Sequence, residues 1–487
     1  MQAPPACFRV EPGIWAGSYF GAGVTDQTEA HIAWLTQQGI GCIIDLSSPD
    51  DQLPSYHALL TNIAPQIQYR NYPIRDGIVP SPALMVAILD HIAWCTHNDI
   101  ALYIHCWGGV GRTGTVIACW FMRAGHTARA AIRLLNERRK VAGLRRESPD
   151  FHAQIDFVEQ WIEPDAETRA AWLRWRDIFR GGILGAALGN AIGVTNDMRS
   201  ANQLTRLDDM QGGGIFSIAK GGWTDETAMM LCVTESLIHM RRFDARDVAD
   251  RFLRWWREGY RTCSGRVYEV GSTTRMALFT YLQTGEPLSG ISSATASGNG
   301  SVTRVVPVAL FYAHAQADLL RYTEINSKIT HGTQVAIDAC RYIAWLIAQL
   351  STGIDKKTAL LCPWPFGDLA PDIERVVSGS YRSKTINDIN TSIDMSETLE
   401  AALWALWHTD DFASGAIVMA NLGGLSEAGG QLYGEIAGVL YGESNLPVDW
   451  LTTLQKYDRI AWMAEELLRT TWKNLTSAPQ KGVSDEQ

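Results

Sequence analysis

The sequence lacks the features that mark membrane, secreted and nucleic-acid-binding proteins. No apolar run approaches the ~20 residues that cross a bilayer, and the first residues show no basic segment followed by an apolar core. The 42 basic residues are outnumbered by 52 acidic ones, and a net charge of −10 does not favour binding of nucleic acid by charge. We therefore expect a cytoplasmic protein that binds neither membranes nor nucleic acid.

Paired cysteines are also missing. The nine cysteines are odd in number and scattered, and no two of them are separated by just two residues. This pattern indicates a reducing compartment and argues against a framework of disulfides or zinc sites. The cysteines are Cys7, Cys42, Cys95, Cys106, Cys119, Cys232, Cys263, Cys340 and Cys362.

A flexible linker is absent too, although the length calls for more than one domain. A chain of 487 residues exceeds what one hydrophobic core usually holds. The join near Pro164 has no glycine- or serine-rich tract, and Asp165 is placed to cap a helix that follows. We expect a multidomain protein with an α/β domain at 1–164, an all-helical domain at 165–476 and a disordered tail at 477–487.

Strand and helix patterns alternate in the first of these domains. Short runs of strand type at 40–46, 67–72 and 100–104 are separated by helical patterns at 26–38 and 82–97. Strands separated by helices predict a central, mostly parallel sheet flanked by helices. The third run leads into a glycine-rich loop, and the carboxyl ends of strands are where open α/β sheets place their ligands.

This loop holds a cysteine and an arginine with five residues between them, Cys106 and Arg112. Its glycines allow several backbone N–H groups to turn inward, and the helix that follows directs its positive end to the same place. Such a loop binds a tetrahedral dianion and stabilises a thiolate at Cys106, while Arg112 holds two oxygens of the anion. The predicted phosphate-binding residues are Trp107, Gly108, Gly109, Val110, Gly111 and Arg112.

Residues 105–114 resemble the His-Cys-x-x-Gly-x-Gly-Arg-Thr-Gly signature of cysteine-dependent protein tyrosine and dual-specificity phosphatases. The resemblance extends over about 8–163 and implies hydrolysis of phosphate monoesters through a phosphocysteine intermediate, without a cofactor. Two alternatives compete with it. A nucleotide P-loop needs Gly-Lys before its Ser or Thr, whereas Gly114 is followed directly by Thr115. The other alternative is an unreactive buried cysteine beside a structural turn.

Three further residues are assigned roles in this phosphatase. Departure of an alkoxide or phenoxide needs a proton donor, and Asp76 lies in the loop where dual-specificity phosphatases carry their acid. An ordinary Asp-Gly turn is the alternative for Asp76. Thr113 is placed to donate a hydrogen bond to the cysteine sulfur. His105 occupies the position at which the family orders the loop, although a core histidine would also fit there.

Helical patterns dominate from residue 180 onward. Glycine recurs at every fourth position in 181–193 and again in 430–442, which creates smooth ridges that helices or a ligand can approach closely. These features predict one large all-helical domain. The clearest helical patterns lie at 228–240, 247–256, 334–347, 397–407 and 458–472.

Five segments of this domain resemble, in order, landmarks of the ADP-ribosylglycohydrolase family. They lie at 181–193, 222–227, 298–301, 330–331 and 423–442. The resemblance implies an all-helical fold in which two divalent metals serve the cleavage of ADP-ribose from proteins or small acceptors. It also implies that ADP-ribose is bound near Asn299, Gly300, Ser301 and His331.

The metal-binding turns depart from that family. The first turn, at 224–226, keeps oxygen-bearing side chains at all three places. In the second, Leu425 and Ala428 cannot bind a hard cation, and Glu427 is a longer carboxylate than the family carries. We therefore expect at most one Mg²⁺ or Mn²⁺, and the alternative is that the first turn only caps a helix. The expected ligands are Thr224, Asp225, Glu226 and Glu427.

Three functions are consistent with these patterns. The leading one is a cysteine-dependent phosphatase fused to a domain that binds ADP-ribose or an ADP-ribosylated ligand and has lost most or all hydrolysis. The second is a bifunctional phosphatase and metal-dependent ADP-ribosyl hydrolase. The third is a non-catalytic ADP-ribose reader, which the intact cysteine loop disfavours. The phosphatase substrate is either a phosphorylated protein or a small phosphorylated metabolite.

Overall fold

The computed structural model describes residues 2–21, 25–293, 296 and 298–477. The chain forms two compact units, Met1–Leu173 and Arg174–Gln487. The division falls within helix α7 (Ala166–Gly193), whose first turn is capped by Asp165 through a 2.8 Å hydrogen bond from the Thr168 backbone N–H. The tail predicted at 477–487 lies outside the described residues except for its first residue.

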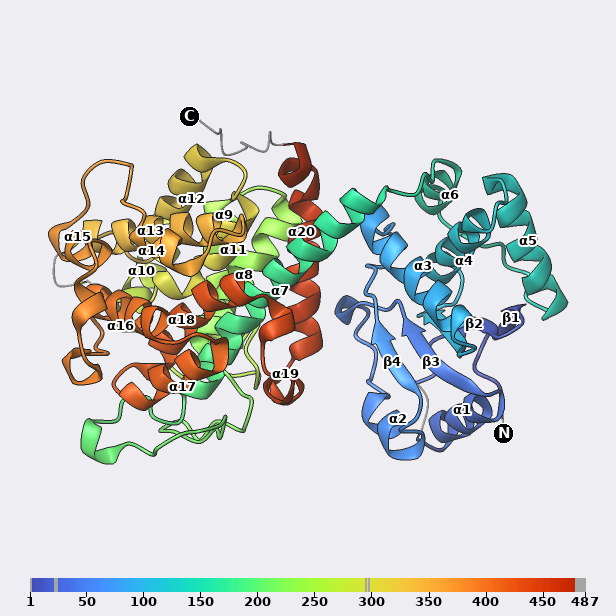
Figure 1. The fold of residues 1–487 in the computed structure, drawn as a ribbon, viewed down its shortest axis with the longest axis horizontal. Coiled ribbons are helices and arrows are strands. Elements are labelled where there is room, and N and C mark those ends of the chain that lie inside the picture. Colours follow the sequence, from blue (N-terminus) through green and yellow to red (C-terminus); the bar gives the residue numbers. More distant parts are fainter. Residues whose placement is uncertain (1, 22–24, 294–295, 297, 478–487) are drawn as a thin grey trace. The chain divides into compact units, whose positions relative to one another are not determined.

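The first unit is built on a five-stranded sheet with the strand order β1-β2-β5-β3-β4 (Figure 1). Only the β1–β2 pair is antiparallel, and the other three pairs are parallel, which confirms the predicted α/β domain. The first two strands are short and were not predicted. The strands are β1 (Phe8–Glu11), β2 (Ile14–Ser18), β3 (Ile40–Asp45), β4 (Gln68–Asn71) and β5 (Ala101–Cys106).

The centre of this sheet is the strand that leads into the cysteine loop. Strand β5 lies between β2 and β3, and its residues Leu102, Tyr103 and Ile104 are fully buried. Helices α3 and α4 pack against β5, so the loop leaves the sheet from its most rigid strand. The helices are α1 (Thr25–Gln37), α2 (His57–Ile63), α3 (Pro82–His97), α4 (Gly111–Arg123), α5 (Ala128–Val141) and α6 (His152–Glu159), with a 3-10 turn η1 (Pro49–Asp51).

The second unit is helical, as predicted, and its described residues include no strand longer than an isolated bridge. Besides α7, the α-helices are α8 (Asp225–Met240), α9 (Ala245–Glu258), α10 (Ser272–Thr284), α11 (Val306–Phe311), α12 (Gln316–Lys328), α13 (Gln334–Ser351), α14 (Lys356–Leu361), α15 (Pro371–Val377), α16 (Met395–His408), α17 (Phe412–Leu422), α18 (Ser426–Tyr441), α19 (Val448–Thr453) and α20 (Tyr457–Ser477). The 3-10 turns are η2 (Ala201–Gln203), η3 (Val302–Arg304), η4 (Ser380–Ser383), η5 (Ile386–Asp388) and η6 (Glu443–Asn445).

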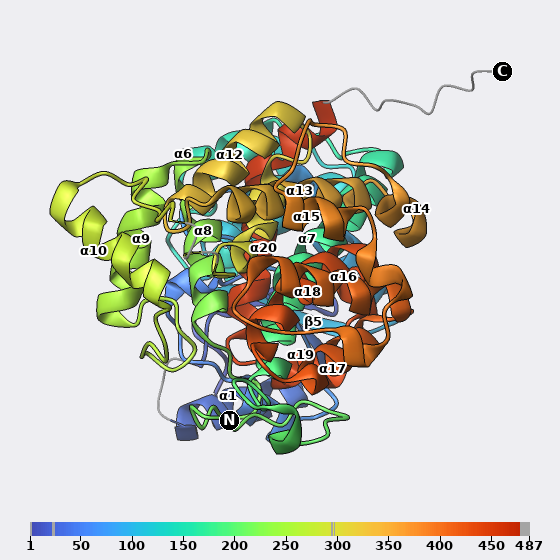
Figure 2. The same ribbon diagram turned by 90° about the vertical axis from the view of Figure 1, so that its left-hand side faces the viewer.

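The two glycine ridges pack against each other, because α7 and α18 lie side by side (Figure 1, Figure 2). A Cβ added to Gly189 would lie 1.9 Å from the carbonyl oxygen of Gly430, and one added to Gly438 would lie 2.1 Å from that of Gly181. No side chain fits between backbones this close, so the four-residue glycine period is a packing requirement of the core. Within the described part of the chain, no helix is long and apolar enough to cross a membrane.

Candidate active sites

The cysteine loop connects the end of β5 to the start of α4 and lies closely over β2. Cys106 is only 2% exposed, and it pairs in the parallel register with Ser18. Gly109 has a φ of +64°, and a Cβ at this position would lie 2.5 Å from the Gly17 carbonyl group. The loop therefore needs glycine both for its backbone conformation and for its approach to β2.

Two side chains from later in the unit support this loop. The Ser148 hydroxyl donates a 2.6 Å hydrogen bond to the Val110 carbonyl oxygen, and the buried Arg139 guanidinium donates a 2.8 Å bond to that of Gly109. By accepting these bonds, the loop carbonyls turn outward and leave the N–H groups on the other side. A role for Arg139 in supporting the loop was not predicted, because this residue lies in a basic helical segment that has the composition of a solvated surface.

Arg112 is buried at the start of α4 and is held by two carboxylates. Its Nη1 donates to Asp51 Oδ2 at 2.6 Å and to the Ile74 carbonyl oxygen at 2.8 Å, and its Nη2 lies 3.2 Å from Asp76 Oδ1. Burial lowers the Arg112 pKa, but the nearby Cys106 and the two carboxylates raise it by a larger amount. The net shift of the Arg112 pKa is therefore upward. The structure thus brings Cys106, Arg112 and Asp76 together, and it adds Asp51, which was not predicted.

His105 belongs to a buried polar chain behind the loop. Its Nε2 is 2.7 Å from the Tyr56 hydroxyl, and its Nδ1 is 3.6 Å from Asp45 Oδ1. Burial lowers the His105 pKa despite the nearby Asp45 carboxylate, so the ring is neutral near pH 7. His105 thus contacts Tyr56 and Asp45 at the point where β5 ends and the loop begins.

Several polar groups around the loop are buried without a hydrogen-bond partner among the described residues: Thr113 Oγ1, Arg112 Nε and both polar atoms of Gln154. Gln154 lies close to the loop, since a Cβ added to Gly111 would meet its side-chain oxygen at 2.7 Å. Buried polar groups without partners are rare in proteins and are typical of sites that a ligand or water completes. Trp107, in contrast, is 55% exposed at the mouth of the loop.

In the helical unit, most of the predicted site residues line a single cavity of about 300 Å³. Two of the predicted residues, Thr224 and Ser301, are not among the described residues that line it. Apolar groups of the second metal-binding turn share its wall with the carboxylates. The predicted site residues that line the cavity are Asp225, Glu226, Asn299, Gly300, His331 and Glu427, and the apolar groups are Leu425 and Ala428.

Three of the residues predicted to bind ADP-ribose, Asn299, Gly300 and His331, lie together on the wall of this cavity. Asn299 donates a 3.0 Å hydrogen bond to the Thr398 hydroxyl. The His331 Nδ1 atom lies 2.7 Å from the Thr330 hydroxyl oxygen. Burial and the nearby Arg304 lower the pKa of His331 to about 3, so its ring is neutral. A Cβ added to Gly300 would lie 3.1 Å from the His331 ring, so this part of the wall is shaped by the absence of a side chain.

The first metal-binding turn is already extensively hydrogen-bonded. Asp225 accepts bonds from Trp255 Nε1 at 3.0 Å and from the backbone N–H groups of Tyr268 and Glu269 at 3.1 and 2.5 Å. Burial raises the Asp225 pKa to about 7 in spite of these bonds. The Thr224 hydroxyl donates to Glu226 Oε2 at 2.7 Å. Both carboxylate oxygens of Asp225 and Oε2 of Glu226 therefore already accept hydrogen bonds from the protein.

Two carboxylates of this region are buried with an oxygen that meets no hydrogen-bond donor in the described residues, Asp197 Oδ2 and Glu427 Oε2. Burial and the nearby Glu226 raise the pKa of Asp197 to about 8 and that of Glu427 well above its usual range. Asp197 was missed in the sequence because it follows the first glycine ridge outside every landmark segment. Across the described ranges, no three carboxylates bring ligand atoms within 4.8 Å of one another.

Comparisons with known proteins agree with this division. The family model described as ADP-ribosylglycohydrolase matches residues 172–475, and one described as polymorphic toxin system, DSP-PTPase phosphatase matches residues 20–126. ADP-ribosylarginine hydrolase Tri1 of Serratia proteamaculans (strain 568) is 33% identical over 294 residues, which cover 60% of this chain and 79% of the relative. Its namesake from Pseudomonas putida (strain GB-1) is 32% identical over 328 residues, covering 65% and 86%.

A solved structure titled ADP-ribosylglycohydrolase-related protein complex superimposes with a TM-score of 0.55 at 33% identity, covering 61% of this chain and 99% of that one. Both resemblances drawn from the sequence are confirmed, and both domains belong to families of hydrolases. The chain belongs to the ADP-ribosylglycohydrolase family, and its helical domain follows an N-terminal domain of the dual-specificity and protein tyrosine phosphatase family.

Proposed function

We propose that the N-terminal unit hydrolyses phosphate monoesters through a phosphocysteine intermediate. The observation that carries this proposal is the convergence of three groups: Cys106 at the start of the loop, the buried Arg112, and Asp76 at 3.2 Å from Arg112. Arg112 Nε and the Thr113 hydroxyl, which lack partners within the described structure, add unused donors to the same place. A bound phosphate would supply an acceptor for Arg112 Nε, and the Cys106 sulfur would supply one for the Thr113 hydroxyl.

In the proposed reaction, the Cys106 thiolate attacks phosphorus, and the S–P bond forms as the bond to the leaving oxygen breaks. Asp76 gives its proton to that oxygen. Water then attacks the phosphocysteine, the S–P bond breaks, and Asp76 takes the proton from the water. Arg112 and the loop N–H groups stabilise the phosphoryl oxygens in both steps, and Thr113 hydrogen-bonds to the departing sulfur.

The experiment that tests this function is hydrolysis of an aryl phosphate by the full-length protein. We expect turnover that is inhibited by vanadate, and Cys106→Ser should remove it by about 10⁴-fold or more, because the nucleophile itself is lost. Cys7→Ser changes another cysteine of the same unit, one that is half-buried and outside the loop, and should remain active. Full activity of Cys106→Ser would refute the proposal.

For the helical unit, we propose binding of ADP-ribose or an ADP-ribosylated ligand with slow or absent hydrolysis. Asn299, Gly300 and His331 line the cavity together and offer a neutral, polar corner for the ligand. At most one Mg²⁺ or Mn²⁺ would be held there, by the carboxylates of Glu226 and Glu427 on the cavity wall with water completing its shell. Leu425 and Ala428 line the wall where further ligands would be needed for a second ion.

Two bound metals would polarise the scissile bond and activate water. With one ion, the residues of this chain are left to bind and orient the ligand. The named relatives are ADP-ribosylarginine hydrolases, so an ADP-ribosylated arginine is the ligand class we favour. Their similarity also supports the alternative, a bifunctional phosphatase and ADP-ribosyl hydrolase.

Calorimetric titration of the full-length protein with ADP-ribose tests the binding proposal. His331→Ala should weaken binding by about tenfold, which corresponds to the loss of one buried polar contact. His314→Ala changes a half-buried histidine of the same unit outside the cavity and should leave affinity unchanged. No binding by the unmodified protein would refute the proposal, and equal affinity of both variants would place the ligand elsewhere.

A further inference from the structure

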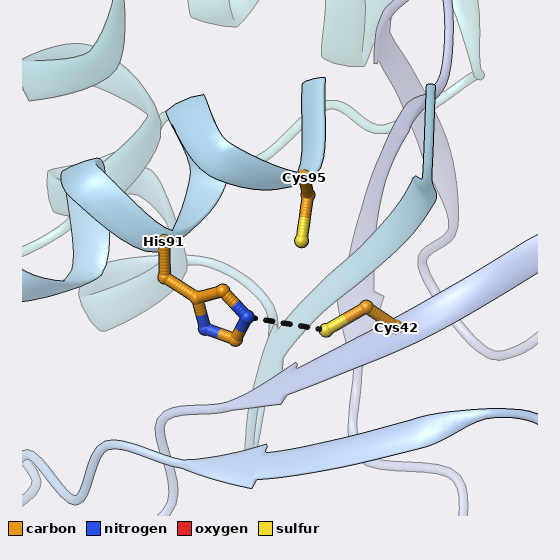
Figure 3. A group of neighbouring side chains, drawn as sticks. All are labelled: Cys42, His91 and Cys95. Atoms are coloured by element: carbon orange, nitrogen blue, oxygen red, sulfur yellow. Dashed lines mark hydrogen bonds between the residues drawn. The ribbon is translucent and has the colours of Figure 1, made fainter. Parts of the chain in front are cut away.

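Three soft ligands converge in the phosphatase unit away from the cysteine loop. Cys42 on β3 faces His91 and Cys95 on α3, and their ligand atoms all lie within 4.8 Å of one another (Figure 3). His91 and Cys95 are four residues apart, which places both on the same face of the helix. Both cysteines are fully buried, whereas His91 is half-buried. The cluster therefore has one side open toward solvent.

The spacing of these atoms suits a tetrahedral metal. Cys42 Sγ and His91 Nε2 are 3.7 Å apart. Zinc binds thiolate sulfur at about 2.3 Å and imidazole nitrogen at about 2.0 to 2.1 Å, and a tetrahedral angle between two such bonds separates the ligand atoms by about 3.6 Å. The observed distance is thus already that of a loaded site. Hard cations prefer oxygen ligands, which excludes Mg²⁺ and Ca²⁺ here.

We propose that Cys42, His91 and Cys95 bind a Zn²⁺ ion, with water as the fourth ligand on the open side. Nothing in the proposed phosphatase chemistry uses these residues, so the site is separate from Cys106. Two thiolates neutralise the dication, and a neutral complex is what a buried position favours.

The surroundings of the cluster favour the ligand forms of its side chains. The Tyr72 hydroxyl lies 3.1 Å from His91 Nδ1 and fixes the orientation of the ring. If Nε2 binds the metal, Nδ1 carries the proton and donates a hydrogen bond to the Tyr72 oxygen. Hydrogen bonds of this kind commonly orient histidine ligands. Both cysteines would bind as thiolates, so zinc binding would release their protons.

The ion would join α3 to β3, the strand that lies beside β5. Tyr72 precedes the loop of Asp76, and the segment after β3 contains Asp51, the partner of Arg112. A zinc site at this position stabilises the segments that carry the acid and the arginine anchor, without contacting substrate. We therefore infer that the ion holds α3 against β3.

Zinc titration of the reduced full-length protein tests the inference, with a chromophoric chelator as competitor and elemental analysis for stoichiometry. We expect one zinc per chain, a higher melting temperature with zinc, and one zinc also in Cys106→Ser, which excludes binding at the nucleophile. His91→Gln and Cys95→Ser should lose the ion and the shift in melting temperature. Cys7→Ser, the control, should keep both.

Cobalt provides a test that needs no variant. Co²⁺ in the unmodified protein should give the intense visible bands of tetrahedral coordination together with thiolate-to-cobalt charge transfer. Absence of these bands, zinc binding that survives in both His91→Gln and Cys95→Ser, or a Cys42–Cys95 disulfide in place of metal would each overturn the inference. Circular dichroism of the variants separates loss of the ion from loss of the fold.

Discussion

The two candidate sites of this protein differ in how their acidic groups are balanced. In the phosphatase unit, Asp51 and Asp76 share an ion pair with the buried Arg112, which also lies near Cys106. In the helical unit, burial and the nearby Glu226 raise the pKa values of Asp197 and Glu427, and no described cation is among the causes of these two shifts. The first region is arranged for an incoming anion, whereas the second needs protons or a metal ion to be stable.

The packing of the helical unit and the chemistry proposed for it rest on different residues. The α7–α18 glycine contact, which no larger side chain can satisfy, is intact. A few positions beyond it, Leu425 and Ala428 stand where the family resemblance implies metal ligands. Packing and catalysis thus depend on different residues of the same helices, and a family fold alone does not decide whether the reaction occurs.

The largest predicted effect concerns the balanced site. Arg112→Lys keeps the positive charge but removes the planar fork that binds two phosphoryl oxygens. We expect kcat for an aryl phosphate to fall by about 10³-fold, since losing a single transition-state donor costs about 10²- to 10³-fold and this change affects two. Steady-state kinetics measure the loss, and a change confined to KM would show that Arg112 binds substrate and transition state equally well.

Asp76→Asn should have a smaller effect that depends on the leaving group. The amide cannot give a proton, so substrates with poor leaving groups should slow by about 100-fold. Activated aryl phosphates should slow much less. Rates measured over a series of leaving groups test this, and an equal loss across the series would contradict the role of Asp76 as the acid.

A third prediction uses a carboxylate of the helical unit whose charge is balanced. Burial raises the pKa of Glu235, but hydrogen bonding and charge from Arg261, with Arg251, lower it to about 2. Because the folded-state pKa is depressed, this pairing stabilises the unit above pH ~4.5, the ordinary value, and the stabilisation disappears as the pH falls toward ~2.

A shift of this size corresponds to at most about 3 kcal/mol of unfolding free energy. Glu235→Gln should be less stable at pH 7, because Arg261 loses its carboxylate partner and Arg251 keeps only Asp247, and its stability should change less between pH ~4.5 and ~2. Denaturant melts across this range provide the measurement. A parallel pH dependence in both proteins would assign the acid sensitivity to other groups.

The smallest predicted gain comes from restoring the family's second metal-binding turn. Leu425→Asp, Glu427→Asp and Ala428→Thr together should raise the affinity for Mn²⁺ by about tenfold or more, because oxygen ligands replace apolar groups on the cavity wall. Calorimetry follows the affinity. Ile393→Ala, which changes an apolar residue of the same cavity and adds no ligand, is the control. Unchanged affinity in the triple variant would show that the backbone no longer has the family's shape.

Local patterns in the sequence were enough to predict what depends on contiguous residues. The loop from His105 to Thr113 is one short segment, and the alternation of strands and helices around it predicted the α/β domain. The strands β1 and β2 were missed although β4, which is equally short, was predicted. Strands β1 and β2 have one β-branched residue each, so their composition does not mark them as strands.

Groups assembled across the fold escaped prediction for a different reason. Asp51 meets Arg112 from 61 residues away, and Cys42 meets His91 from 49 residues away. No local spacing relates such pairs, and their meeting depends on the register of β3 beside β5 and on how α3 packs. Cysteine spacing alone argued against a zinc site for this reason, because it detects only ligands that are neighbours in sequence.

The central claim is that the phosphatase site is complete and the ADP-ribosyl hydrolase site is not. It is tested most directly by assaying one full-length preparation for both activities, with Mg²⁺ or Mn²⁺ and with a chelator, at a temperature well below unfolding. We predict phosphate release from an aryl phosphate under all conditions, and slow or no release of ADP-ribose from an ADP-ribosylated arginine peptide. Rapid, metal-dependent release of ADP-ribose, with two Mg²⁺ or Mn²⁺ ions bound per chain, would contradict the claim.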